Sequence, residues 1–548
     1  MSKVLVVGFD GATFDVVLPL VSQGRLPNVA NLMQRGTWGP LRSAIPPITP
    51  TAWTTFFTGK NPGKHGVFDF HELDPDTYEM RPVRVDRHTE KSIWQLLTEA
   101  GKTSIVVDVP YTYPPQPLQG VQITGYGTPR TPGTVFTYPQ DLADRVPADL
   151  RPEIRVALPR HTFDRSLAFV DEWTAIMDGR RRLLRHLMKE HDWDFFFVVF
   201  TITDFMAHVF WTFVEPAHPN YKRPEGSTYR EAFFRAYEQA DALLGELMTW
   251  AGPATTTLVM SDHGFGSIYP RQYLFRKLAE GGFVRFRSAP LLSRAGDRLI
   301  KATMQAYTSL PFLREWVKSM RPQRQKAVKM LLRRGGLIPS AGAVDFRKSP
   351  VLPSNSSLQM WINSQDRFTH GIVSLHEKHD LLDRLSRYLR ALQDPVTQEP
   401  VVADVYQGSD VYQGPAVPRG PDLVIEYHNF YRPDAESRTV NPYLEGGHTG
   451  YGIFLAYGPG VRPTEVAGAS LTDLAPTVLY LLGEPVPPDM DGRVIAEMFT
   501  KAYRTAHPVR YGTWPARLEE APAGAESAYT PEQEAEIEDQ LRRLGYIE

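Results

Sequence analysis

The stretch MSKVLVVGFDG (residues 1–11) sets the fold class. Its apolar run is short, uninterrupted and rich in Val, which is typical of a strand buried on both faces of a sheet, and it ends at Asp10. Segments with helical spacing, such as 27–36 and 169–191, alternate with further runs of the same type. These runs are TSIVVDVP (103–110), DFFFVVFT (194–201), TTTLVMSD (255–262), PDLVIEYH (421–428) and GIFLAYGP (452–459). The alternation predicts an α/β fold with a mostly parallel central sheet sandwiched by helices.

The composition is that of an ordinary globular protein. The chain has 548 residues, of which 42% are hydrophobic and 22% charged, and its net charge of −2 gives no general indication of a nucleic-acid partner. Cysteine is absent, which excludes disulfides, thiolate metal sites and a cysteine nucleophile in this chain. Any metal ion must therefore be held by Asp, Glu, His or hydroxyl groups.

The sequence predicts no membrane-spanning segment. No apolar signal region precedes the first strand, and no stretch of 18 or more uninterrupted apolar residues occurs. We therefore expect a soluble cytoplasmic protein without a transmembrane segment.

One region differs in charge from the rest of the chain. Residues 276–334 contain 15 Lys and Arg against three acidic residues, with helical spacing. The basic face is either a solvated surface or a contact for an anionic substrate or a membrane surface, and these alternatives stay open. We predict four segments: a first part of the catalytic core (1–270), a basic helical insertion or cap (271–345), a second part of the core (346–500), and a C-terminal extension with an exposed helix (501–548).

Polar residues follow several of the predicted strands. Because ligands of parallel α/β sheets bind at the carboxyl ends of the strands, these residues are candidates for a site. Three Asp and three His side chains suit two divalent ions of the zinc or manganese kind better than calcium or magnesium, which prefer oxygen ligands. Zinc is the first choice. The candidates are Asp10, Asp204, His208, Asp262, His263 and His448, the last placed by the glycine-rich loop EGGHTGYG.

A nucleophile is expected in TPTAWTTFFTG (residues 49–59). Thr49 precedes the predicted helix, so its hydroxyl would lie at the positive helix end, where an anion binds and a bound metal could lower the pKa of that hydroxyl. Thr51 is the competing candidate, and its side chain could instead cap the helix.

Taken in this order, the motifs resemble the alkaline phosphatase superfamily. The resemblance is to its type I phosphodiesterase/nucleotide pyrophosphatase branch and to the related predicted phosphohydrolases and phosphomutases, and it extends from residue 4 to about residue 492. The matching motifs are VVGFDG, LPNVANLMQRG, TPTAWTTFFTGKNPGKHG, TDFMAH, SDHGFG, GGHTGYGIFLAYGPG and LTDLAPTVLYLLGEPVPPDMDG.

The resemblance implies an alkaline-phosphatase-like fold and two metal sites. One ion would be bound by Asp10, Thr49, Asp262 and His263, and the other by Asp204, His208 and His448. Both ions would be Zn²⁺, with Mn²⁺ as the alternative. Thr49 stands where the family has its nucleophile.

The implied activity is that of a metal-dependent phosphohydrolase. We expect a phosphodiesterase that acts through a phospho-threonine intermediate on a small-molecule substrate, a nucleotide-like or other phosphodiester. A phosphomutase or phosphotransferase using the same site is the alternative. No specific nucleic-acid partner is inferred, and peripheral membrane contact would involve the basic insertion.

Three further residues are candidates for the substrate pocket. Trp53 could stack on a base or ring, Asp108 could line the pocket, and Arg271 could offset substrate charge. The sequence does not identify the leaving group or the oligomeric state.

Overall fold

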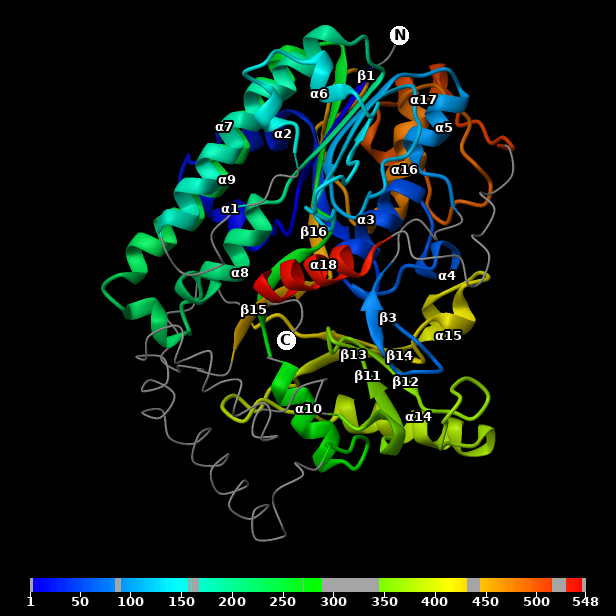
Figure 1. The fold of residues 1–548 in the computed structure, drawn as a ribbon. Helices are drawn as coiled ribbons and strands as arrows, with labels where there is room; N and C mark the ends of the chain where they lie inside the picture. The colour runs from blue at the N-terminus through cyan, green and yellow to red at the C-terminus, as the bar shows by residue number, and fades with distance from the viewer. Residues whose placement is uncertain are drawn as a thin grey trace.

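The computed structural model describes residues 3–83, 90–155, 159, 167–269, 271–287, 344–430, 444–514 and 529–544. It has a larger lobe built on a central sheet and a smaller lobe built on a second sheet (Figure 1). Within the described chain the central sheet has ten strands, nine of them in one path with β18 paired to β2. In path order they are β17 (Thr464–Glu465), β2 (Thr37–Arg42), β16 (Tyr451–Tyr457), β9 (Thr255–Met260), β1 (Lys3–Phe9), β8 (Phe195–Phe200), β5 (Ser104–Val109), β6 (Gly120–Thr124) and β7 (Thr137–Tyr138), with β18 at Ala469–Ser470.

The centre of this sheet is parallel, as the apolar runs predicted. Strands β9, β1, β8, β5 and β6 pair in parallel, while β16 and β7 join their neighbours antiparallel. Every residue of β5, β8 and β9 is buried, which explains why these runs show no alternation of polar and apolar residues. The predicted α/β class is therefore confirmed.

Helices cover both faces of the central sheet (Figure 1). One face carries α1 (Phe14–Ser22), α2 (Pro27–Arg35), α7 (Leu167–Glu190), α8 (Ile202–Val214) and α9 (Gly226–Ala251). The other carries α3 (Thr49–Thr58), α5 (Ile93–Glu99), α16 (Leu471–Leu481) and α17 (Lys501–Ala506). Short turns complete this lobe: α4 (Pro62–His65), α6 (Leu142–Arg145), η2 (Arg151–Glu153), η3 (Pro219–Lys222) and η7 (Ala496–Met498).

The C-terminal helix α18 (Pro531–Leu544) forms as predicted but is not simply exposed. Its Ile537 and Leu541 are buried in the apolar core that lies under α7 and α8. The prediction of an exposed helix within 501–548 is therefore wrong for one of its faces, because these apolar residues are four apart and line one side of the helix.

The smaller lobe is built on an antiparallel sheet in the order β11 (Val351–Pro353), β12 (Gln359–Ile362), β14 (Leu423–Tyr427) and β13 (Val402–Gln407). Its other elements are α10 (Arg271–Glu280), α14 (Leu375–Arg390), α15 (Gly408–Val411), η5 (Phe346–Lys348) and η6 (Val417–Arg419). The run 421–428 thus belongs to this sheet and not to the parallel one. The predicted second part of the core (346–500) is therefore wrong for 346–430, and the central sheet resumes only at β16.

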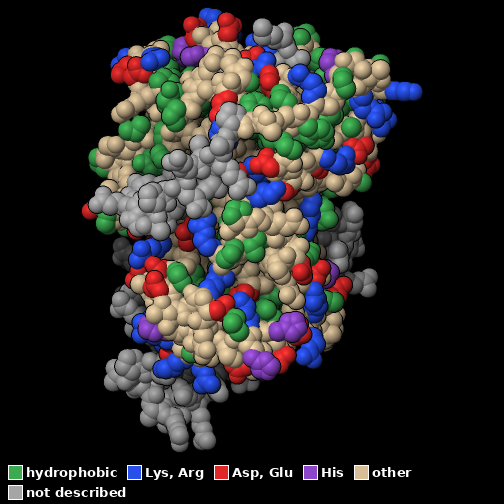
Figure 2. Space-filling view, turned by 90° about the vertical axis from the view of Figure 1, so that its right-hand side faces the viewer, with side chains coloured by type: hydrophobic (Ala, Val, Ile, Leu, Met, Phe, Trp, Pro, Cys, Tyr) green, Lys and Arg blue, Asp and Glu red, His purple; other side chains and the backbone are tan. Residues whose placement is uncertain are grey.

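Most of the basic segment lies outside the described residues, which resume at 344 after 287. Of the predicted insertion 271–345, helix α10 packs in the core of the smaller lobe through Leu274, Phe275 and Leu278. On the face shown in Figure 2, acidic and basic side chains are interspersed. None of the described helices is both long and apolar enough to cross a membrane.

Two short strand pairs lie where the lobes meet. The first pairs β10 (Gly264–Ile268) with β15 (Glu445–Thr449), and the second pairs β3 (His71–Leu73) with β4 (Met80–Pro82). The parallel strands of the central sheet run toward the smaller lobe, so their carboxyl ends face this junction (Figure 1).

Candidate active site

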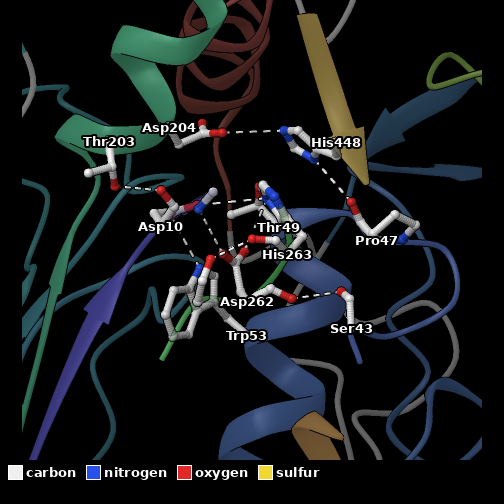
Figure 3. Close-up of polar contacts among 12 residues, drawn as sticks. Asp10, Ser43, Pro47, Thr49, Trp53, Thr203, Asp204, Asp262, His263 and His448 are labelled. Atoms are coloured by element: carbon white, nitrogen blue, oxygen red, sulfur yellow. Dashed lines mark hydrogen bonds and ion pairs between the residues drawn. The ribbon is translucent and has the colours of Figure 1, made fainter. Parts of the chain in front are cut away.

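The first group of site residues comes from three elements at the carboxyl edge of the central sheet. Asp10 directly follows β1, Asp262 and His263 follow the neighbouring β9, and Thr49 opens α3. His263 Nε2 lies 3.3 Å from Thr49 Oγ1, 3.3 Å from Asp262 Oδ2 and 3.7 Å from Asp10 Oδ1 (Figure 3). All four residues are buried. The sequence separates them widely, but the strand ends bring them together.

Two carboxylate oxygens of this group have no hydrogen-bond partner among the described residues. They are Asp10 Oδ1 and Asp262 Oδ2, and both are buried. Leaving a buried carboxylate oxygen without a partner is costly, so such atoms in a native protein require an explanation. The donor set of two carboxylates and one imidazole, all within 4.8 Å of one another, fits a divalent ion.

The second group lies beside the first. Asp204 and His208 stand four residues apart on α8, so both project from one side of that helix, and His448 comes from β15. Asp204 Oδ1 lies 3.4 Å from His208 Nε2 and 3.5 Å from His448 Nε2, and the two imidazole nitrogens are 3.0 Å apart. These three side chains also could hold a metal ion.

The rings of His263 and His448 join the two groups. They are stacked with centroids 3.6 Å apart and planes inclined by 19°. His263 Nδ1 lies 3.0 Å from the carbonyl oxygen of Gly264, and His448 Nδ1 lies 3.0 Å from that of Pro47 (Figure 3). A carbonyl only accepts, so Nδ1 carries the proton in each ring and the Nε2 lone pair points into the site. This tautomer is the one that a metal ligand requires.

Burial and neighbouring charged groups shift the pKa values of the three aspartates. Burial raises the pKa of Asp10, and the neighbouring carboxylates of Asp262 and Asp204 raise it further. Burial and the carboxylate of Asp204 raise the pKa of Asp262 as well. Burial would also raise the pKa of Asp204, but His208 and His448 outweigh it and hold that pKa below its usual value.

Burial acts in the opposite sense on the imidazoles. It lowers the pKa of both His263 and His448, so these rings stay neutral near pH 7. Neutral imidazoles are able to bind a metal ion. No Lys or Arg among the described residues pairs with the carboxylates of Asp10 and Asp262, whose pKa values are raised. Both observations fit cation binding at the paired groups.

The first turn of α3 differs from the prediction in its cap. Helix α3 begins at Thr49, and Ile48 is the N-cap, without a side-chain hydrogen bond. Thr51 therefore lies inside the helix, and its buried Oγ1 has no hydrogen-bond partner among the described residues. The interpretation of Thr51 as the N-cap is wrong, because the chain turns into the helix two residues earlier. The hydroxyl at the helix end, and beside His263, is that of Thr49.

Trp53 lies in the core and not in a substrate pocket. Its side chain is fully buried beneath Gly8 of β1 and packs against Phe56 and Phe197. The indole Nε1 donates to Asp10 Oδ2 at 3.3 Å (Figure 3). The prediction that Trp53 stacks on substrate is therefore wrong, because one turn of α3 places it against the sheet, where it orients a carboxylate of the first group.

Asp108 and Arg271 complete the predicted pocket residues. Asp108 is buried and pairs with Arg180 through two hydrogen bonds of 2.6 and 2.9 Å. Its prediction as a substrate-binding residue is wrong, because a neighbouring cation already occupies both of its oxygens. Arg271 begins α10, its side chain lies outside what the structure describes, and its role stays a prediction.

The structure also adds residues that the sequence did not single out. Thr203 donates from Oγ1 to the Asp10 carbonyl at 2.5 Å, and Ser43 donates from Oγ to the Asp262 carbonyl at 2.6 Å (Figure 3). Thr203 directly precedes Asp204, so its position in the motif was a usable signal. The carbonyl of Pro47, which fixes the His448 tautomer, leaves no trace in a sequence pattern.

Comparison with protein families gives one match that spans most of the chain. The model described as type I phosphodiesterase / nucleotide pyrophosphatase matches residues 4–452. The chain belongs to this family. The resemblance seen in the sequence is thus confirmed, and this member of the phosphodiesterase/pyrophosphatase family is a hydrolase acting on phosphoric ester bonds.

Solved structures with similarity to this family member were also found. Human ectonucleotide pyrophosphatase/phosphodiesterase 5 matches with 15% identity and a TM-score of 0.46, over 91% of this chain and 100% of that one. The phosphonoacetate hydrolase of Sinorhizobium meliloti, in complex with phosphonoformate, matches with 14% identity and a TM-score of 0.47, over 88% and 95%. The comparison with curated proteins returned no match.

Proposed function

We propose that the protein is a two-metal phosphodiesterase that cleaves a small-molecule phosphodiester through a phospho-threonine formed on Thr49. The observation that carries this proposal is the convergence of Thr49, at 3.3 Å from His263 Nε2, with two adjacent groups of carboxylate and imidazole ligands. Membership of a family described as type I phosphodiesterases supports the preference for diesters.

The two groups suit two ions of the zinc kind. Asp10, Asp262, His263 and the Thr49 hydroxyl would hold one ion, and Asp204, His208 and His448 the other. A mixture of carboxylate and imidazole donors favours zinc, with manganese as the alternative. When bound, a pair of such ions lowers the pKa of an attacking hydroxyl and offsets the charge of the phosphoryl oxygens.

Thr49 supplies the attacking atom. After its hydroxyl proton is lost to solvent, Oγ1 bonds to phosphorus, the bond from phosphorus to the leaving oxygen breaks, and the departing alkoxide takes a proton from solvent. The Thr49 side chain then carries the remaining phosphoryl ester. The N-terminus of α3, where backbone N–H groups lack helical partners, favours the negative charge of that group.

Water completes the cycle at the same phosphorus. It bonds to phosphorus on the side opposite Thr49 Oγ1, the bond to Oγ1 breaks, and the Thr49 hydroxyl is restored as the phosphomonoester leaves. Trp53, Thr203 and Ser43 hold Asp10 and Asp262 in place through these two steps by the hydrogen bonds described above.

A comparison of two chromogenic esters tests this proposal. The protein loaded with Zn²⁺ or Mn²⁺ is expected to hydrolyse bis-p-nitrophenyl phosphate faster than p-nitrophenyl phosphate. A preference for the monoester would contradict the proposed substrate class. If added alcohols receive the phosphoryl group in place of water, the enzyme is the alternative phosphotransferase.

A further inference from the structure

A partly buried ion pair joins the two lobes next to the active site. Arg42 ends β2 of the central sheet, and Glu426 lies on β14 of the smaller lobe. Arg42 Nη1 lies 2.5 Å from Glu426 Oε1 and Nη2 lies 2.7 Å from Oε2, so the guanidinium binds both oxygens. Tyr406 on β13 adds a third donor, its hydroxyl lying 2.8 Å from Glu426 Oε2. Bidentate pairs of this kind fix geometry as well as supplying energy.

The ion pair lies directly against the turn that follows His448. Strand β15 ends at Thr449 and β16 begins at Tyr451, so Gly450 alone connects them. A Cβ at Gly450 would lie 2.3 Å from Arg42 Nη1 and 2.4 Å from Glu426 Oε1. The backbone at this position therefore packs directly on the pair, which leaves no room for a side chain.

The segment that follows Arg42 connects the ion pair to Thr49. Ser43, next to Arg42, donates its backbone N–H to the Gly450 carbonyl at 2.9 Å. Two residues further on, the carbonyl of Ile45 accepts from the hydroxyl of Tyr412 in the smaller lobe at 2.7 Å. The segment between β2 and α3 is thus held by the smaller lobe, while its Pro47 carbonyl orients His448.

We propose that Glu426 and Arg42 are positioning residues of the active site, which hold the Gly450 turn so that His448 stays within reach of Asp204 and His208. The inference rests on the proposed two-metal function. His448 is the one ligand of the second group that comes from outside α8, so its distance from the others depends on how this turn is held. The smaller lobe then contributes to the metal site without providing a ligand.

The charges of the pair suit this role. Burial would raise the pKa of Glu426, but the hydrogen bonds and charge of Arg42 outweigh it and lower that pKa. Both partners therefore stay ionised at neutral pH. Removing one would leave a partly buried charge without its partner, and neighbouring groups would move to solvate it.

Zinc titration of the metal-free, full-length protein tests the inference. In Glu426→Gln, the second ion is expected to bind about 10-fold more weakly, the lower end of the loss caused by removing a group hydrogen-bonded to a ligand, because Glu426 acts on His448 only through the turn. The first ion should be unaffected. Gly450→Ala is expected to act in the same way, because its methyl group displaces the pair from the turn. The control is Glu246→Gln, which breaks the bidentate Arg181–Glu246 pair between α9 and α7 and should change neither ion.

A double variant assigns the effect to His448. Adding Glu426→Gln to His448→Ala is expected to cause no further loss of zinc, because the ligand that Glu426 positions is already absent. Tyr406→Phe keeps the ion pair but removes the two hydrogen bonds of the Tyr406 hydroxyl, one to Glu426 and one from Arg42. It should show a smaller loss, and it serves if Glu426→Gln does not fold, as judged by circular dichroism.

Two results would overturn the inference. One is that folded Glu426→Gln and Gly450→Ala bind the second ion within twofold of the parent. The other is that both ions weaken equally, which would mean that the pair only joins the lobes. A parent protein that binds fewer than two ions would instead refute the proposed two-metal function, and this inference with it.

Discussion

The two threonines of the TPT sequence differ in their surroundings although they lie two residues apart. The hydroxyl of Thr49 lies 3.3 Å from His263 Nε2 at the start of α3, while that of Thr51 is buried inside the helix without a partner among the described residues. Of the two hydroxyls, only that of Thr49 lies beside the ligand groups, as the proposed attack on phosphorus requires. The difference leads to opposite expectations for the two side chains.

Replacing Thr49 should abolish turnover without emptying the site. Thr49→Ala is expected to lower kcat by about 10³-fold or more, since the attacking atom is lost, while the other ligands of the first group retain the ion. Thr49→Ser should keep measurable activity because the hydroxyl survives. Steady-state kinetics together with elemental analysis of the same samples measure both effects.

Thr51 provides the matched control. Thr51→Val removes a buried hydroxyl that has no described partner and preserves its shape, so stability should be unchanged or slightly higher. Activity should stay within a few-fold of the parent. A folded, metal-loaded Thr51→Val protein without activity would show that the nucleophile has been assigned to the wrong threonine.

The division of the ligands between two ions can be tested one ligand at a time. His448→Ala should weaken one of two zinc ions strongly and the other little, and Asp204→Ala should affect the same ion. Asp262→Ala should affect the other ion. Competition with a chromophoric chelator measures the two affinities, and equal loss of both ions in every variant would contradict the division.

The positions of some site residues could be predicted from the sequence, and those of others could not. Asp10 and Asp262 were predictable because strand ends in a parallel sheet converge, whatever the details of packing. Trp53 was not, because which way a helical side chain faces depends on how α3 lies against β1 and β8. The ion pair of Glu426 could not be predicted from the sequence, because it joins Glu426 to Arg42, 384 residues away.

At the scale of elements, α3 connects the core to the site. All ten of its residues are buried, and the helix ends at Gly59 in the left-handed region, with φ of 68°. A Cβ there would lie 3.0 Å from Ala475 of α16 and from Met490. The helix is therefore fixed at its far end as well as at Thr49, so packing along its length sets the position of the Thr49 hydroxyl.

A substitution of Trp53 tests this connection. Trp53→Phe loses the hydrogen bond to Asp10 and leaves a cavity, so the free energy of unfolding should fall by at least ~2 kcal/mol. Because the ring is buried, KM should respond equally for substrates with and without an aromatic group. Denaturant unfolding and a pair of aryl and alkyl phosphodiesters provide the measurements, and a selective loss for aryl substrates would contradict the placement.

The elements were predicted with uneven success for a physical reason. Buried parallel strands such as β1, β8 and β9 give continuous apolar runs that stand out in the sequence. Strand β14 gives a similar run, PDLVIEYH, but pairs antiparallel in the smaller lobe. A short apolar run does not specify its partners, which are set by contacts far along the chain.

At the scale of the whole molecule, metal binding should affect stability. Asp10 and Asp262 each have a buried carboxylate oxygen without a hydrogen-bond partner among the described residues, and a bound ion would supply one. An ion that binds only the folded protein stabilises it by about 2.7 kcal/mol when its concentration is 100 times its Kd. Added Zn²⁺ should therefore raise the Tm of metal-free protein at pH 8. Differential scanning fluorimetry measures this shift, and Mg²⁺ at the same concentration should give a smaller one.

The zinc-induced shift should depend on pH in a defined direction. The pKa values of Asp10 and Asp262 are raised in the folded, metal-free protein, so protons compete with zinc as the pH falls through those values. The stabilisation is thus fully present above the raised pKa values and lost below them. A zinc-induced shift that grows on acidification would contradict the assignment of these carboxylates.

The stereochemical course at phosphorus tests the central claim most directly. A phosphorothioate diester of one configuration is hydrolysed in ¹⁸O-labelled water, and the configuration of the product is determined. Two successive displacements, first by Thr49 and then by water, each invert phosphorus, so we expect net retention. Net inversion would mean that water attacks the substrate directly, and it would rule out Thr49 as a covalent nucleophile.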